Sequence, residues 1–485
     1  MLASRPLQYT AAMRDEEQTG TSGEPELAPT DAGVSSETGV PRASGLAVWS
    51  WALYDFSNTI FSVGILSFFF PLWLGDELGA GAGAVNYLAA GSALLVALVA
   101  PFLGAVADLR QRRVPYLVVL TVLAVLFTAG LDLAGNILLA CALFAAADVA
   151  YQSSLVFYNA LLPGVSAGRG AGRVSGYGTA LGYVGSIGAL VALTSFVTDG
   201  AAIKAWLGPL GGWLGTGEGQ NSNAFLPTAV LYLLFSLPAF LFVPDRAVAQ
   251  PRPVNLVGTY RSVLSTIRSM RGAYRPVGIF MVATLLYTDA ANTAVANVAL
   301  YGREVFGMGQ TEIRNLLLFS TVFAGVGSIG FGYASDRAGP KKALVWVLLT
   351  WLAAIVLTTA ALAPWMLFLA GPLVGGALGG TWTVSRVMLV ALSPPEKLGE
   401  FFGMYSIAGR LSAIMGPAVT AVLLTVFEPF VGTAAYRISI GSLALIMALG
   451  LFFLLRVPDV RPGPNVEEFA PDEGNPHETA ATGPA

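Results

Sequence analysis

Twelve stretches of mainly apolar residues recur along this chain, and each is close to the length that a helix needs to cross a membrane. A hydrocarbon layer about 30 Å thick requires about 20 such residues in a helix. The stretches lie near 47–74, 85–107, 115–134, 137–162, 174–197, 225–243, 277–300, 314–334, 343–362, 365–392, 401–426 and 437–457. We therefore expect an all-α membrane protein of twelve transmembrane helices, arranged as two six-helix bundles at 45–243 and 277–457.

The composition agrees with lipid as the solvent for most of the chain. Of the 485 residues, 55% are hydrophobic and 11% are charged, and the mean hydropathy is +0.67. Because a soluble domain carries about 25% charged residues, this chain lacks the charge to cover a water-facing surface of its size. We expect the polar ends, 1–44 and 458–485, to be disordered cytoplasmic tails, and the basic segment 244–276 to be a cytoplasmic linker loop.

Lysine and arginine are concentrated in alternate loops between the predicted spans. The basic loops hold Arg110, Arg112, Arg113, Arg169, Arg173, the six arginines of 244–276, Arg337, Lys341, Lys342 and Lys397. The opposite loops hold few basic residues, chiefly Lys204 and Arg303. Because basic loops remain on the cytoplasmic side, we expect both termini in the cytoplasm of a protein integral to the cell inner (plasma) membrane.

Several classes of function find no support in the sequence. Cys141 is the single cysteine and His477 the single histidine, so no disulfide framework or cysteine metal site is expected. A proton relay within the membrane would have to use Asp or Glu, because no histidine lies in a predicted span. We expect no enzyme activity, no cofactor, no metal and no nucleic-acid partner. The expected partners are a small-molecule substrate and the lipid bilayer, and the sequence does not decide whether protons are also bound. The chain is expected to be a monomer.

Two motifs occur once in each half of the chain. Gly-x-x-x-Asp followed by basic residues occurs at Gly104 and Asp108 and again at Gly332 and Asp336. The pattern Asp-x-x-Asn-Thr begins at position 55 and recurs at position 289. Two related six-helix halves about an axis along the membrane normal are typical of major facilitator transporters.

The Gly-x-x-x-Asp loops resemble the signature loop of the major facilitator superfamily, which latches the cytoplasmic side in one conformational state. Glycine lets neighbouring helices approach closely, and the Asp can pair with basic residues or with a helix N-terminus. The expected latch residues are Gly104, Asp108, Arg112, Arg113, Gly332, Asp336, Arg337 and Arg410. A simple charge cluster that sets the topology is the alternative interpretation.

Five charged residues fall well inside the predicted spans, away from the span ends, namely Asp55, Asp148, Asp289, Arg386 and Arg410. A charge at bilayer depth is costly, and such residues usually face a cavity or pair with one another. These side chains therefore indicate either a central polar site or a set of structural salt bridges between helices that never contact a substrate.

We expect a substrate site between the two halves, built from two facing polar patches. Asp55 and Asn58 lie three residues apart and share a helix face, as do Asp289 and Asn292. The expected substrate-binding or coupling residues are Tyr54, Asp55, Asn58, Asp148, Tyr151, Gln152, Tyr158, Asn159, Tyr287, Asp289, Asn292, Trp382 and Arg386.

Four segments are similar to the vacuole-effluxer-like branch of the major facilitator superfamily, which includes the yeast vacuolar amino-acid effluxer and many bacterial relatives. They are SWALYDFSN at 50–58, GRVSGYGTALGYVGSIG at 172–188, LYTDAANT at 286–293, and the segment 380–410. The resemblance covers about 45–457. It implies a twelve-helix permease and, in the fungal members, efflux of amino acids from the vacuole.

Together these observations predict secondary transport of a small polar or zwitterionic organic solute, such as an amino acid, by alternating access. Asp55 or Asp289 would bind a solute amine or carry a coupling proton, and Arg386 would bind a carboxylate. Facilitated uniport and drug efflux remain alternatives on the same fold. A non-transporting membrane sensor is a further alternative, as is a membrane enzyme or lipid scramblase.

Overall fold

The computed structural model describes residues 42–110, 112–200, 219–245 and 255–460. Every regular element in these ranges is a helix, as expected for an all-α membrane protein. The predicted tails, 1–44 and 458–485, lie almost wholly outside the described residues, as does the linker segment 246–254.

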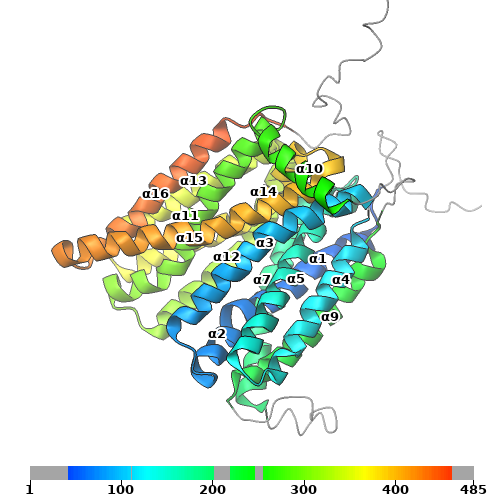
Figure 1. The fold of residues 1–485 in the computed structure, drawn as a ribbon. Coiled ribbons are helices and arrows are strands. Elements are labelled where there is room, and N and C mark those ends of the chain that lie inside the picture. Colours follow the sequence, from blue (N-terminus) through cyan, green and yellow to red (C-terminus); the bar gives the residue numbers. More distant parts are fainter. Residues whose placement is uncertain (1–41, 111, 201–218, 246–254, 461–485) are drawn as a thin grey trace, which may run out of the picture.

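The first half of the chain contributes a set of long helices drawn from blue to green in Figure 1. Its elements are α1 (Gly45–Phe61), η1 (Ser62–Phe69), α2 (Phe70–Leu72), η2 (Trp73–Glu77), α3 (Ala82–Arg110), α4 (Val114–Ala129), η3 (Leu131–Leu133), α5 (Ile137–Ala160), α6 (Leu162–Ser166), α7 (Ala171–Thr198), η5 (Asn221–Ala224) and α9 (Phe225–Phe242). The run from α1 to η2 forms one continuous span, Gly45–Glu77.

The second half contributes another set, drawn from green through yellow to red on the other side of the molecule (Figure 1). Its elements are α10 (Leu256–Ser269), α11 (Arg275–Phe306), α12 (Gln310–Ala338), α13 (Pro340–Ala360), α14 (Pro364–Leu392), η6 (Pro395–Lys397), α15 (Leu398–Val431) and α16 (Ala434–Leu455). One buried apolar cluster comes mainly from residues 48–243, and a second mainly from 263–457.

Eleven helices within the described residues are long and apolar enough to cross a membrane. The remaining expected span is α15, which has 34 residues and is therefore about 50 Å long at 1.5 Å per residue. Its second part, Gly416–Val431, is an apolar helical segment. With α15 included, the structure agrees with the expected number of twelve spans.

Helix starts and turns follow from local sequence. The Ser44 hydroxyl accepts a hydrogen bond from the Ala47 amide at 3.1 Å, which caps α1. Asn136 caps α5 in the same way, through the Leu139 amide at 2.9 Å. Between α12 and α13, Gly339 has φ of +93°, a conformation that favours glycine, and the following proline begins α13.

The basic linker is not a simple loop, because α10 occupies residues 256–269 of it. The buried positions Thr259, Val263 and Thr266 recur at helical spacing and face the protein. Tyr260 stacks on Phe102 of α3 with ring centroids 4.6 Å apart. The prediction of a loop here was wrong. The many arginines of the segment made it look like a polar loop, and its short amphipathic helical pattern was overlooked.

The first span changes from α-helical to π-helical geometry at Ser62. A second π-helical stretch, Trp73–Glu77, ends the span. Such wide turns are rare in proteins and occur frequently at functional sites. The first of them begins directly after the polar residues of α1, so it shapes the wall of the central cavity described next.

Candidate functional site

A cavity of about 430 Å³ lies between the two halves and is lined by both. Its walls come from α1, η1, α5 and α7 on one side and from α14 and α15 on the other. The polar and aromatic lining residues are Asp55, Asn58, Thr59, Ser62, Tyr151, Gln152, Tyr158, Asn159, Thr179, Tyr183, Trp382, Arg386, Phe402, Tyr405, Ser406 and Arg410.

An ion pair joins the two halves across this cavity. Arg386 of α14 donates from Nη2 to Oδ2 of Asp55 on α1 at 2.9 Å, and each side chain is only 10% exposed. The same nitrogen donates to the Thr179 hydroxyl of α7 at 2.8 Å. Because desolvated charges attract strongly, this contact fixes α14 against α1 and α7 in the present conformation.

Aromatic rings and unpaired donors surround the Arg386 guanidinium. Its central carbon lies 5.7 Å from the Trp51 ring centroid and 5.8 Å from that of Tyr158, within the range of cation–π attraction. Arg386 Nη1 and the hydroxyls of Tyr158 and Tyr183 are buried without a hydrogen-bond partner in the described residues. Buried donors of this kind can bind an incoming acceptor such as a carboxylate.

A chain of hydrogen bonds holds the Asp55 carboxylate in place. Asn58 Nδ2 donates to Asp55 Oδ1 at 2.9 Å, and the Tyr151 hydroxyl donates to Asn58 Oδ1 at 3.1 Å. Asp55 and Asn58 therefore share one helix face, as their spacing predicted. This arrangement leaves Asp55 oriented toward the cavity by its own helix and by α5.

A second ion pair also crosses between the halves. Arg410 of α15 donates to Asp148 Oδ1 of α5 at 3.0 Å. The Ser92 hydroxyl donates to Asp148 Oδ2 at 2.6 Å, and Gln152 Nε2 donates to Oδ1 at 3.1 Å. Asp148 itself lies behind the wall, while Gln152 and Arg410 line the cavity. Arg410, which we expected to act as a latch, therefore joins the two halves beside the cavity and not at the Gly-x-x-x-Asp loops.

Eight of the predicted substrate-site residues line the cavity, namely Asp55, Asn58, Tyr151, Gln152, Tyr158, Asn159, Trp382 and Arg386. Residues that the prediction missed include Thr59 and Ser62, which follow Asp55 at helical spacing and could have been found by that signal. Thr179 and Tyr183 lie in the glycine-rich segment 172–188 of α7, which carried a family resemblance but none of the predicted site residues.

Two predicted tyrosines lie away from the cavity. Tyr54 is fully buried, and its hydroxyl is bonded to Thr121 and Ser154 inside its own bundle. Tyr287 is also fully buried, with its hydroxyl 2.8 Å from that of Ser385. Tyr54 was placed wrongly because adjacent residues on a helix point about 100° apart, so the neighbour of the cavity residue Asp55 faces another helix. Tyr287 was placed wrongly because its face of α11 packs against α14 within the second half.

The expected polar patch on α11 does not face Asp55. Asp289 is 0% exposed, and its Oδ1 accepts a hydrogen bond from the Gly416 amide of α15 at 2.6 Å. Asn292 is partly exposed but does not line the cavity. The prediction failed because α15 covers this face of α11, where Gly416 offers no side chain to hold the helices apart.

The first Gly-x-x-x-Asp loop binds the start of a helix in the other half. Asp108, near the end of α3, accepts hydrogen bonds from the amides of Gly399 and Glu400 at 3.0 and 2.8 Å. These amides open α15, so Asp108 acts as a cap that is favoured by the helix dipole. Arg113 lies 3.3 Å from the same carboxylate.

The second loop repeats this contact in the opposite direction. Asp336 of α12 accepts hydrogen bonds from the amides of Gly172 and Arg173 at 2.7 and 3.0 Å, at the start of α7. The Arg173 side chain donates to the same carboxylate at 3.0 Å. Arg112 and Arg337, also predicted for the latch, are exposed on the surface.

Glycines allow these two crossings. A Cβ atom at Gly104 would collide with the backbone of Gly399, and one at Gly332 would collide with the backbone of Gly172. The Tyr177 and Tyr333 hydroxyls add a bond of 2.9 Å between α7 and α12. The halves thus meet at the end that carries the basic loops, whereas α2 and the end of α15 lie apart at the opposite end in Figure 1.

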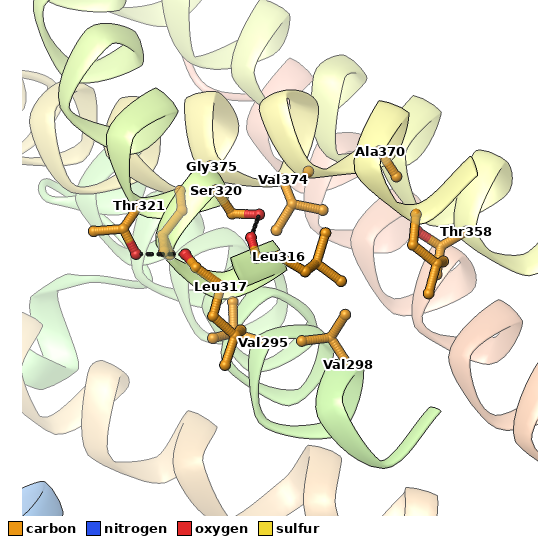
Figure 2. Close-up of a pocket in the computed structure, with 13 residues that line it drawn as sticks. Val295, Val298, Leu316, Leu317, Ser320, Thr321, Thr358, Ala370, Val374 and Gly375 are labelled. Carbon is orange, nitrogen blue, oxygen red and sulfur yellow. Dashed lines mark hydrogen bonds between the residues drawn. The ribbon is translucent and has the colours of Figure 1, made fainter. Parts of the chain in front are cut away.

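A smaller crevice of about 70 Å³ lies inside the second half, among α11, α12 and α14. Figure 2 shows the Ser320 and Thr321 hydroxyls bonded to the carbonyls of Leu316 and Leu317, one turn earlier in the same helix, at 2.9 and 2.8 Å. The rest of the lining is mainly apolar, including Val295. This crevice therefore offers little to a polar ligand, and the central cavity remains the candidate site.

A polar cavity between two sets of apolar helices, closed at one end by paired Gly-x-x-x-Asp loops, defines a transporter of the major facilitator superfamily. The chain belongs to the Vacuole effluxer Atg22 like family, whose model matches residues 166–464. This match confirms the resemblance seen in the sequence. The chain is a membrane transporter and not an enzyme.

Individual relatives agree with this assignment. The chain is 26% identical over 430 residues to an uncharacterized MFS-type transporter, YxiO, of Bacillus subtilis, covering 84% of this chain and 94% of that one. It is 26% identical over 268 residues to the multidrug resistance protein MdtG of Dickeya zeae, covering 54% and 62%. The human organic anion transporter MFSD10 shares the fold, with a TM-score of 0.64 at 14% identity over 84% of this chain and 99% of that one.

Proposed function

We propose that this chain is a secondary transporter that moves a small polar or zwitterionic organic solute, such as an amino acid, by alternating access. The membrane is the cell inner (plasma) membrane, with both termini in the cytoplasm. The observation that carries the proposal is the Asp55–Arg386 ion pair, because it lines the central cavity and its two members belong to different halves.

A zwitterion matches the charges of this pair. Its ammonium group would replace Arg386 as the partner of Asp55, and its carboxylate would bind the Arg386 guanidinium and the unpaired hydroxyls of Tyr158 and Tyr183. Binding would therefore exchange one buried ion pair for two without leaving a charge unpaired. A volume of about 430 Å³ is in the range of small-molecule sites.

The closed end supports alternating access. Basic loops lie at the end where Asp108 and Asp336 cap α15 and α7, so the positive-inside rule makes this the cytoplasmic end. The conformation described here is then outward-facing. Transport requires that both caps and the ion pairs across the cavity break while new contacts form at the outer end, with the solute held between the halves.

Transport by purified protein in liposomes tests the proposal. Liposomes preloaded with unlabelled L-amino acids should take up an external mixture of radiolabelled L-amino acids by exchange. We expect Asp55→Asn and Arg386→Lys each to reduce exchange by about tenfold or more, since each removes part of the charge or the planar fork that binds the zwitterion. Asp76→Asn, at an exposed site in η2, is the matched control. Wild-type rates in both cavity variants would contradict the assignment.

Drug efflux is a second candidate, favoured by the aromatic walls of the cavity. Tyr151, Tyr158, Tyr183, Trp382, Phe402 and Tyr405 line it. An amphipathic organic cation could stack on these rings and pair with Asp55 without using Arg386. If the liposomes transport a lipophilic cation but no amino acid, and Arg386→Gln transports that cation as well as wild type does, then this function replaces the first.

A further inference from the structure

Asp289 occupies the centre of a membrane-spanning helix and is separate from the cavity. It lies midway between Arg275 and Arg303, which are near the two ends of α11. With the rise of an α-helix, each of these arginines is about 21 Å away along the helix axis. The side chain is 0% exposed and does not line the central cavity. Asp289 is thus the deepest acid of α11 and lacks contact with water in this state.

The Asp289 carboxyl is only half satisfied. Oδ1 accepts the Gly416 amide, whereas Oδ2 is buried without a partner in the described residues. The Thr293 hydroxyl, one turn along the same helix, is likewise buried without a partner. On α15, Gly416 is followed by Pro417, which has no amide hydrogen, so the backbone ladder of α15 is interrupted where it meets Asp289.

The basic side chains on neighbouring helices have other partners. On α14, Arg386 pairs with Asp55; on α15, Arg410 pairs with Asp148. On α16, Arg437 donates to the backbone carbonyls of residues 359 and 361. The charged residues of α12 and α13 lie toward the ends of those helices. The buried Glu400 opens α15, far along that helix from Gly416.

The internal repeat shows why the two acids differ. Asp289 is the counterpart of Asp55 in the repeat, and the offset that relates these two positions also makes Gln152 the counterpart of Arg386. Gln152 is neutral and donates to Asp148. The acid of the first half, Asp55, therefore pairs with a cation from the other half, whereas Asp289 pairs with no cation among the described residues. An ionised carboxylate buried without a cation is costly, so Asp289 is accommodated here as the neutral acid.

We propose that Asp289 is the site at which this transporter takes up and releases the proton that couples transport to a pH gradient. The proposal rests on the transport function proposed above. The proton comes from water at one face, forms the O–H bond of the carboxyl group, and returns to water at the other face after the halves rearrange. No other covalent bond changes.

A metal ion fits this position less well than a proton does. Cations such as Ca²⁺ and Mg²⁺ need about six or more oxygen ligands. The described residues supply the Asp289 carboxylate and the Thr293 hydroxyl here, and they contain no group of three or more His, Cys, Asp or Glu side chains arranged for a metal.

Liposome transport separates coupling from movement of the solute. We expect Asp289→Asn to exchange radiolabelled L-amino acids within about twofold of the wild-type rate, because exchange needs no net proton transfer. A gradient of about one pH unit stores about 1.4 kcal/mol and supports up to about tenfold accumulation for one proton per solute. With the pH gradient in one direction, wild type should accumulate the labelled amino acids inside the liposomes above their external concentration. Uptake by Asp289→Asn should stop when the internal and external concentrations are equal. Equal accumulation by both proteins would overturn the proposal, as would accumulation that follows sodium instead of pH.

Infrared spectroscopy tests the protonation site without any solute. Wild-type protein should show the carbonyl band of a buried carboxylic acid at neutral pH, and this band should be lost in Asp289→Asn but kept in Asp76→Asn. A spectrum unchanged by Asp289→Asn would overturn the proposal even if that variant were unstable in transport assays. If wild type exchanges no amino acid while the band behaves as expected, the proposed substrate class fails and the protonation site stands.

Discussion

Arg386 belongs to the second half and holds the cavity together through contacts with the first. It bonds to Asp55 and Thr179 of the first half and lies over the rings of Trp51 and Tyr158. A lysine would keep the charge but would lose the planar surface and the second donor. The identity of this residue, beyond its charge, therefore determines how the two sides of the cavity are held together.

Removal of either member of this pair leaves the other buried and unpaired. We expect Asp55→Asn and Arg386→Gln each to lower the free energy of unfolding by about 3 kcal/mol, and the double variant to cost less than the sum of the two. Denaturant unfolding in detergent would measure this. Strictly additive effects would show that the two side chains do not depend on each other.

At this scale the sequence identified most of the charged residues but not their partners. The depth of Asp55 and Arg386 in apolar spans was enough to single them out. Their pairing depends on which face of α14 meets α1, and that depends on helix packing between residues 331 positions apart. For the same reason, Tyr54 and Tyr287 were assigned to the cavity although their side chains point into their own bundles.

Helix crossings depend on glycines that leave no room for a side chain. On α12, Gly332 packs against the Gly172 backbone, whereas a Cβ at Gly330 would meet nothing within 4 Å. We expect Gly332→Ala to separate α7 from α12 at a cost of about 1–3 kcal/mol, and Gly330→Ala to have no effect. The separation of α7 from α12 can be measured with Ser335→Cys in a protein that also carries Cys141→Ala. The rate at which maleimide labels the cysteine at this buried position reports how far the two helices have separated.

Labelling should rise in the Gly332→Ala background only. Equal labelling in both backgrounds would show that this crossing tolerates a methyl group, and that the glycine is not required for closure. The two substituted positions lie close together on one helix and both replace Gly by Ala, so the change in helix propensity is the same for both. They differ in the surface that each position faces.

The helices themselves were largely predictable, because length and apolar content define a membrane span. What the sequence did not indicate is how helices depart from regular geometry. The π-helical turns from Ser62 have no simple composition signal. The amphipathic helix α10 was hidden among arginines, although Thr259, Val263 and Thr266 carry its periodicity.

The whole molecule is closed at one end by two reciprocal caps. Asp108 binds the start of α15, and Asp336 binds the start of α7. Because replacing a capping Asp by Ala costs about 0.5–2 kcal/mol, Asp108→Ala with Asp336→Ala should favour the open cytoplasmic end by about 2 kcal/mol, or about thirtyfold in population.

Electron paramagnetic resonance between spin labels at Arg112 and Glu396 measures that population, in protein with Cys141 replaced. The long-distance population should grow in the double variant. Asp459→Asn, which breaks an exposed ion pair with Lys342 within one half, should leave the distances unchanged. An unchanged distribution in the double variant would show that the caps do not hold this end closed.

The repeated motifs predicted the architecture of the whole molecule, since two copies of Gly-x-x-x-Asp and of Asp-x-x-Asn-Thr indicate two related halves. Symmetry also misled the prediction of the site. Equivalent sequences suggested equivalent roles for Asp55 and Asp289, but within the part of the chain that the structure describes only Asp55 has a cation opposite to it. A repeat identifies equivalent positions, whereas the partner of each position depends on the other half.

The two ion pairs across the cavity, Asp55 with Arg386 and Asp148 with Arg410, sum to zero formal charge. Membrane voltage does about 2.3 kcal/mol of work per elementary charge for each 100 mV, but these pairs separate and re-form in every cycle and so carry no net charge across the membrane. Any electrical current recorded during turnover must therefore be carried by the solute's own net charge or by an ion that moves with it.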